Sequence, residues 1–177
     1  VAIIDTGVDT LHPDLQANIN LSASKNFVEP GQKPDDDFGH GTHVAGIVAA
    51  VGDNNVGAAG VAFGCKIAAV RVLGVDGTGT TWSTVQAIDW AVEKGCKVLN
   101  MSLGSPDASP LEAEAIARAT AAGSLVVAAA GNEAADGNYL EYPACYPGVL
   151  SVAAVDRDEK RATFSNYNSW VGVAAPA

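Results

Sequence analysis

The sequence predicts an α/β fold in which helices cover a mostly parallel, doubly wound sheet. Two observations lead to this prediction. Short runs rich in apolar residues alternate with longer helical stretches, and such alternation is typical of parallel sheets with right-handed crossovers. The apolar runs are also almost continuously hydrophobic, which is typical of strands buried on both faces. A chain of 177 residues is long enough to form one domain with its own core.

The strand candidates are the apolar runs, at Val1–Asp5, Ile67–Val72, Val98–Ser102, Leu125–Ala130 and Val149–Val155. Between them lie the predicted helices, at Gly41–Ala50, Trp82–Glu93 and Leu111–Ala122. The last of these follows Pro110 and ends at Gly123, as expected for a helix start and a helix end. The polar Ser22–Phe38 region is expected to form a surface loop with an edge strand. Because strand-like runs lie at both ends of the chain, we expect it to be clipped at both ends.

Composition excludes several classes of protein. The chain is 48% hydrophobic, which argues against disorder. No apolar run approaches the roughly 20 residues of a membrane helix. A formal net charge of −10 makes nucleic acid an unsuitable partner. Among three cysteines, Cys65 and Cys96 have similar surroundings; two buried thiols are favoured over a disulfide between them, which remains a hypothesis.

Polar residues that follow the predicted strands are candidates for chemistry, because sites in such sheets form beyond the carboxyl ends of the strands. They are Asp5, Ser102 and the Gly131-Asn132 pair, and His40 lies at a helix start. A carboxylate that orients a histidine makes up two thirds of a nucleophilic triad. Taken alone, Asp5 is more simply a cap or turn residue and His40 a structural histidine. Their combination with the other two segments favours catalysis.

Ordered motifs along the whole chain resemble the subtilisin (subtilase, peptidase S8) family of serine proteases, in its thermitase and subtilisin branch. They are Asp5–Asp9 (DTGVD), His12–Leu15 (HPDL), His40–Gly46 (HGTHVAG), Asn100–Gly104 (NMSLG), Ala128–Glu133 (AAAGNE), Phe164–Tyr167 (FSNY) and Val173–Pro176 (VAAP). The resemblance implies a subtilisin-like three-layer fold. Residues 1–177 would then be a partial catalytic domain that lacks the family's N-terminal segment and its C-terminal helices and strands.

The resemblance also implies a role for each polar residue. Asp5 would orient the general base His40, and His43 would be a structural residue packed within the helix. Asn132 would donate its side-chain amide to the developing oxyanion, for which a rigidly held neutral donor is suited. Taken alone, Gly131-Asn132 is about as well explained by a left-handed turn. The implied activity is an endopeptidase that acts through an acyl-enzyme.

Substrate binding in the family pairs an extended peptide or protein segment between two edges of main chain. The matching positions here are Gly77, Gly79, Ser102, Leu103 and Gly104, although the two glycines also fit a simple turn after Asp76. The walls of the primary pocket would be Ala129, Ala130 and Gly131 on one side and Tyr142, Pro143 and Ala144 on the other. Such small walls leave room for a large apolar residue, and Glu133 near the floor would also favour a basic one.

A loop after the histidine helix resembles the family's structural Ca²⁺ site. The matching ligands are all oxygens, as calcium prefers: the carbonyls of Gly52, Val56 and Ala58, the Asn54 side chain and the Asp14 carboxylate. The alternative is an Asn/Gly turn without metal. Because the family adds a ligand from an N-terminal segment that is missing here, we expect the site to be weakened.

No Gly-Thr-Ser motif occurs, so we expect the nucleophilic serine to lie outside the chain and the chain alone to be inactive. The alternative function is an inactive fragment or split half that acts as a scaffold or a peptide-binding module. An aspartic protease is disfavoured because only one Asp-Thr-Gly triplet is present. A phosphatase-type loop at Asp76 lacks its nucleophile. We further expect a secreted monomer that a propeptide or protein inhibitors could bind, with no membrane partner.

Overall fold

The computed structural model describes residues 1–177, and the chain divides into two units, Val1–Asn100 and Met101–Ala177. Parallel pairing dominates both units, which confirms the predicted α/β class. No helix is long and apolar enough to cross a membrane. All three cysteines are free, so the hypothetical bond between Cys65 and Cys96 is not formed.

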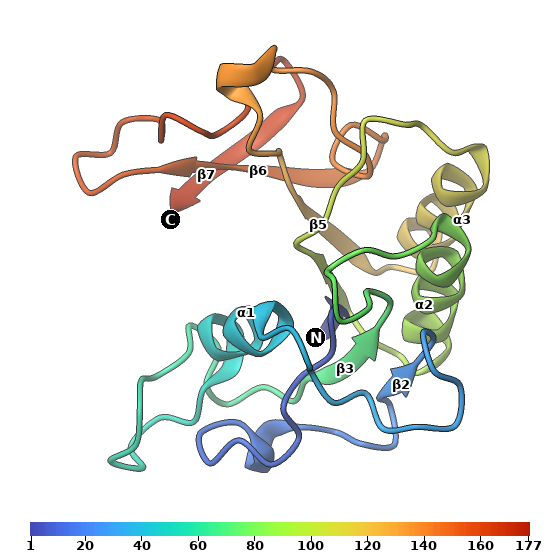
Figure 1. The fold of residues 1–177 in the computed structure, drawn as a ribbon, viewed down its shortest axis with the longest axis vertical. Helices are drawn as coiled ribbons and strands as arrows, with labels where there is room; N and C mark the ends of the chain where they lie inside the picture. Colours follow the sequence, from blue (N-terminus) through green and yellow to red (C-terminus); the bar gives the residue numbers. More distant parts are fainter. The chain divides into compact units, whose positions relative to one another are not determined.

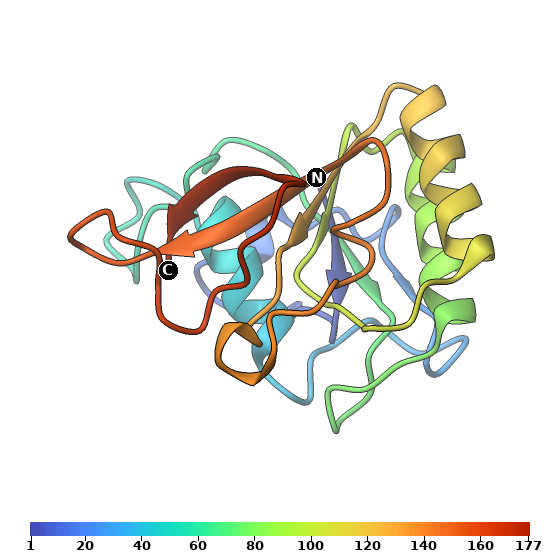
Figure 2. The ribbon, with the colours of Figure 1, turned by 90° about the horizontal axis from the view of Figure 1, so that it is seen from above.

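The first unit is built on strands in the order β2-β3-β1-β4. Their bounds are β1 (Ala2–Asp5), β2 (Lys25–Asn26), β3 (Ala68–Arg71) and β4 (Val98–Met101), and a 3-10 turn, η1, spans Gln16–Asn18. Helices α1 (His40–Ala49) and α2 (Thr81–Glu93) lie on opposite sides of this sheet (Figures 1 and 2). The short edge strand β2 confirms the edge strand expected between Ser22 and Phe38.

The second unit contains helix α3 (Pro110–Ala121) and strands β5 (Leu125–Ala129), β6 (Val149–Val155) and β7 (Val171–Pro176), with a 3-10 turn, η2, at Ala134–Asp136. The long strands β6 and β7 run side by side in parallel, with a register shift between Ser151 and Val152 (Figure 2). Helix α3 packs on β5. Its Ser109 cap and Pro110 start give the helix the boundary that the sequence predicts.

The buried strand β1 determines the position of Asp5, the first polar residue of the predicted site. All four residues of the strand are buried, and it pairs with β3 on one side and β4 on the other. Ile3 packs with residues of α1 and the following loops in one core cluster, which includes Val8, Leu15 and Ala45. A central strand held in this way has little freedom to slip, because one step would turn its apolar side chains to the opposite face. The strand therefore fixes the position of Asp5 at its carboxyl end.

Candidate active site

Asp5 ends strand β1 inside the core, where an ionised carboxylate needs hydrogen bonds. Its Oδ1 accepts a hydrogen bond from the Thr6 amide at 2.7 Å and lies 2.7 Å from His40 Nδ1. Its Oδ2 is buried and has no hydrogen-bond partner. The carboxylate therefore depends on His40 for its only side-chain partner, which fixes the direction of the imidazole ring.

Helix α1 begins at His40, and its N-terminus is held by a residue that the sequence analysis missed. Asp36 Oδ1 accepts from the Gly39 amide at 2.8 Å, while Oδ2 accepts from the Thr42 amide at 2.9 Å and the Thr42 hydroxyl at 2.7 Å. Burial alone would raise the pKa of Asp36, but these hydrogen bonds outweigh it and lower the pKa. The sequence signal that could have identified Asp36 is an acidic residue one turn before the start of a predicted helix.

Gly41 allows β1 and α1 to approach closely at the point where Asp5 meets His40. A methyl group at this position would overlap the Gly7 carbonyl oxygen and lie 3.1 Å from Asp5 Cβ. The Gly41 amide donates to Thr6 Oγ1 at 2.9 Å. Glycine is therefore required here, because the main chain at Gly7 leaves no room for a side chain at this position of α1.

The charge on Asp5 determines how His40 can work. A carboxylate can only accept hydrogen bonds, so Nδ1 of His40 carries a proton and Nε2 of the neutral ring is an acceptor. The hydrogen bond to Asp5 raises the pKa of His40 above 6.5, and the charges of Asp5 and Asp36 add to this, against a smaller lowering by burial. The His40 side chain is 41% exposed. The arrangement can therefore accept a proton at Nε2 and stabilise the resulting imidazolium.

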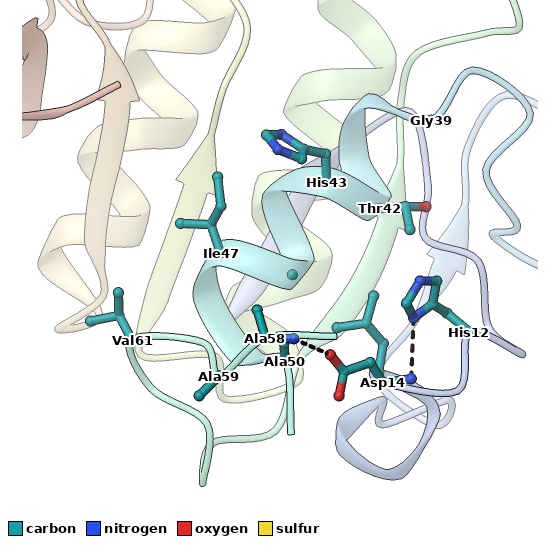
Figure 3. Close-up of a pocket in the computed structure, with 12 residues that line it drawn as sticks. His12, Asp14, Gly39, Thr42, His43, Ile47, Ala50, Ala58, Ala59 and Val61 are labelled. Atoms are coloured by element: carbon teal, nitrogen blue, oxygen red, sulfur yellow. Dashed lines mark hydrogen bonds between the residues drawn. The ribbon is translucent and has the colours of Figure 1, made fainter. Parts of the chain in front are cut away.

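His43 does not have the packed, structural role that the resemblance implied. It is exposed on the side of α1 opposite to the buried Gly41 and Ala45. With Ile47 it lines a hollow of about 590 Å³ (Figure 3). The expectation was wrong because the helical repeat places His43 and Ile47, four residues apart, on the exposed face of α1, away from the buried Gly41 and Ala45.

In the second unit, Gly131 and Asn132 form a turn at the end of β5. Gly131 has φ +109°, a left-handed conformation that disfavours a side chain, so the turn that the sequence left open as an alternative does form. The backbone amide of Asn132 donates to Glu133 Oε2 at 2.7 Å. The Asn132 side chain itself is exposed.

Asn166 is completely buried and holds this turn through hydrogen bonds. Its amide donates to the Gly131 carbonyl at 3.0 Å, and its side-chain oxygen accepts from the Glu133 amide at 2.8 Å. Its Nδ2 donates to Glu133 Oε2 at 3.1 Å. Asn166 thus holds the main chain on either side of Asn132 at two points and the Glu133 side chain at a third, which is the rigidity that a preorganised hydrogen-bond donor needs.

A second carboxyl, that of Glu141, lies beside this turn and was also missed from sequence. Glu141 is 5% exposed. Burial raises its pKa to about 7, and the neighbouring charge of Glu133 and a hydrogen bond to Glu133 add to the effect. Glu133 and Glu141 therefore form a carboxyl pair that holds a proton near neutral pH. The available signal was an acidic residue directly before the predicted wall Tyr142-Pro143-Ala144.

The predicted substrate-binding positions fall in short backbone segments. Gly77, with φ +74°, belongs to a turn, as the sequence alternative allowed, and Gly79 forms an antiparallel bridge with Leu73. In the second unit Ser102, Leu103 and Gly104 follow β4 directly. The next residue, Ser105, exchanges two 2.9 Å hydrogen bonds with Tyr142. This bridge ties the end of the predicted pairing segment Ser102–Gly104 to the predicted pocket wall that begins at Tyr142.

At the proposed calcium loop the structure brings Asp14, Asn54 and Ala58 together. Asp14 Oδ1 accepts from Asn54 Nδ2 at 2.6 Å. Asp14 Oδ2 accepts from the Ala58 backbone amide at 3.0 Å (Figure 3). These two hydrogen bonds lower the pKa of Asp14. Gly57, with φ +53°, passes so close that a methyl group there would overlap Asp14 Oδ2.

The loop suits calcium in its chemistry, because its side chains and carbonyls offer only oxygen ligands around one carboxylate. No group of three or more His, Cys, Asp or Glu side chains is placed to share a metal ion, so main-chain and amide oxygens must supply most ligands. In the structure Asn54 turns its nitrogen toward Asp14 and its oxygen toward the Val56 amide. To bind calcium, Asn54 would have to turn its side-chain oxygen toward Asp14. The carbonyls of Gly52, Val56 and Ala58 would complete the predicted ligand set.

Comparisons with known proteins identify the family and the fold of the chain. The chain matches the profile of the Subtilase family over residues 1–177. It is 43% identical over 176 residues to Subtilisin BL of Lederbergia lenta, covering 99% of this chain and 62% of that protein. It is 42% identical to the thermostable alkaline protease of Halalkalibacterium halodurans, of which it covers 46%.

A solved structure has the same fold. The crystal structure of a cold adapted subtilisin-like serine proteinase superposes with a TM-score of 0.87 at 32% identity. The match covers 99% of this chain and 61% of that one. The predicted subtilisin-like fold is therefore confirmed, and the chain spans less than two thirds of the relatives that it matches.

Proposed function

Because this chain belongs to the subtilase family, we propose that it forms, within the complete protein, most of the catalytic domain of a serine endopeptidase. The observation that carries the proposal is the 2.7 Å contact between the buried Asp5 carboxylate and His40 Nδ1. It leaves Nε2 of a half-exposed imidazole as the proton acceptor.

In this mechanism the peptide bond is attacked by a serine outside residues 1–177, which contain no Gly-Thr-Ser motif. His40 Nε2 takes the serine proton and then gives it to the leaving amine, so that an acyl-enzyme forms and water releases it. Asp5 orients His40 and stabilises its charged form. The exposed side-chain amide of Asn132 donates to the oxyanion, supported by the hydrogen bonds of Asn166.

The substrate is an extended peptide or protein segment that pairs with the main chain at Gly77–Gly79 and Ser102–Gly104. We also propose that Ca²⁺ binds at Asp14, Asn54 and the carbonyls of Gly52, Val56 and Ala58, where it would crosslink the loop. Secretion, a monomeric state and binding of a propeptide or inhibitors are expected from the family. Appearance of the processed protein in culture medium as a monomeric species would test the first two.

Active-site labelling tests the proposed function. The complete protein that contains this chain is treated with a serine-directed fluorophosphonate and assayed on a chromogenic peptide. We expect labelling and cleavage in the wild type and a loss of both by several orders of magnitude in His40→Ala, because no other group can accept the serine proton.

His43→Ala is the matched control, because His43 lies three residues along the same helix and is exposed. It is expected to label and cleave like the wild type. Full activity of His40→Ala would refute the proposed mechanism. Peptide binding without labelling or cleavage would favour a peptide-binding module instead. Residues 1–177 expressed alone are expected to show no labelling.

A further inference from the structure

Glu141 directly precedes one predicted wall of the primary substrate pocket, Tyr142-Pro143-Ala144, and its side chain contacts Gly131 at the end of the other wall. A methyl group on Gly104 would overlap Glu141 Oε2, and one on Gly131 would lie 2.6 Å from Glu141 Cγ. The side chain is therefore in contact with the main chain at Gly104, in the predicted substrate-pairing segment Ser102–Gly104, and at Gly131, in a predicted pocket wall. Its carboxyl group thus lies where the predicted pairing segment and the predicted pocket meet.

The position of Glu141 is fixed on both sides. The adjacent Tyr142 is bridged to Ser105 by two 2.9 Å hydrogen bonds. The Cys145 amide donates to the Glu141 carbonyl at 3.0 Å. Because the backbone on each side is tied down, the side chain has few alternatives to its place beside Gly104 and Gly131. Glu141 is thus part of the pocket and not a mobile surface residue.

Glu133 does not neutralise this acidic group. The charge that acts on Glu141 is that of Glu133, another carboxyl, and no basic side chain contributes to its electrostatic environment. Glu133 is itself committed to the Asn132 amide and to Asn166 Nδ2. The pair therefore carries negative charge that no cation of the protein balances. Buried charge of this kind is stabilised by a cation that enters from outside.

We propose that Glu141 makes a basic side chain, lysine or arginine, the preferred substrate residue at the primary pocket. The inference deepens the proposed endopeptidase function and rests on it. An ammonium or guanidinium group would reach the carboxyl pair along an apolar stem and form charge-assisted hydrogen bonds. A large apolar side chain would instead cover the carboxyl pair without balancing its charge, which is unfavourable. The small pocket walls by themselves favour a large apolar residue, and the sequence allowed a basic one through Glu133; the position of Glu141 makes the basic residue the preferred one.

The test compares lysine with norleucine, its uncharged near-isostere, before the cleaved bond of an otherwise identical peptide. For the complete protein at pH 8 we expect kcat/KM for lysine to exceed that for norleucine by roughly tenfold or more, the size of one hydrogen bond to a charged group. In Glu141→Gln the ratio should fall to about one or below. Glu114→Gln removes an exposed charge from α3 and should keep the wild-type ratio.

Each outcome decides something different. Cleavage of both peptides with norleucine preferred by the wild type would overturn the inference but keep the proposed function. An unchanged ratio in Glu141→Gln would assign the preference to another residue and also overturn it. If neither peptide is cleaved, the proposed function fails. Fluorescence anisotropy with the labelled lysine and norleucine peptides then decides the inference, since equal affinities in wild type and Glu141→Gln would refute it.

Discussion

At the residue scale, the buried Asp5 carboxylate serves both the stability of the fold and the orientation of His40. The strand that carries it is completely buried, so the carboxylate would be costly there without partners. The Thr6 amide and His40 supply them. The contact that gives the buried Asp5 carboxylate a side-chain partner also decides which nitrogen of His40 carries a proton. Stability and proton transfer therefore depend on one interaction.

Asp5→Asn should lower the pKa of His40 toward 6.5, because the hydrogen bond and charge that raise it are lost. In the wild type, protonated His40 stabilises the fold fully below pH 6.5, and this contribution is lost as pH rises through the raised folded pKa. The variant should lack this contribution. Titration of the His40 ring by NMR measures the change. In the complete protein kcat should fall by about 10⁴-fold, as expected when the histidine tautomer is wrong.

Asp158→Asn is a suitable control for this change. It removes a carboxylate that is 77% exposed and lies in the other unit. The pKa of His40 should be the same as in the wild type. A His40 pKa that does not move in Asp5→Asn would show that the contact with Asp5 is not what raises it.

At the scale of elements, the strands and helices could be predicted, because their signals are local. Continuous apolar runs gave β1 and β3 to β6 within one residue at most ends, and Pro110 and Gly123 marked α3. Side-chain pairings between distant segments could not be read in this way. Glu141, for example, contacts Glu133 only because the turn at Gly131-Asn132 and the Ser105–Tyr142 bridge bring them together. Asp5 and His40 could be identified because one follows an apolar run and the other begins a helix, and the family motifs then assigned their roles.

The loop after α1 is the element on which calcium is expected to act. Adding Ca²⁺ to the complete protein should raise Tm, because a ligand that binds only the folded state stabilises it, by about 2.7 kcal/mol at one hundred times its Kd. Asp14→Asn should abolish the rise, since it removes the only charged ligand. Asp53→Asn, in the same loop but outside the ligand set, should retain it. Differential scanning calorimetry with calcium or chelator makes the comparison, and an equal rise in Asp14→Asn would exclude the proposed ligand set.

At the scale of the whole molecule, the formal net charge of −10 makes pH a general influence on stability. Mutual repulsion among carboxylates increases as they ionise, in the wild type and in any variant alike. The Glu133–Glu141 pair adds a local contribution within the second unit. Comparing a variant with the wild type at each pH removes the general effect and leaves the local one.

Glu141→Gln should therefore change the shape of the stability profile. In the folded state the pKa of Glu141 is raised from 4.5 to about 7, so the folded protein holds a proton that the unfolded chain releases earlier. The wild type then loses stability as pH rises from about 4.5 to about 7, and the loss is complete above that range. Glutamine stays neutral and is spared this loss. Urea unfolding should find the variant close to the wild type at pH 4.5 but relatively more stable at pH 8, whereas Glu114→Gln should follow the wild type throughout. Wild-type and Glu141→Gln profiles that stay parallel across this range would mean that the pair does not hold a proton in the folded protein, and the Glu141 carboxyl would then be fully charged at neutral pH.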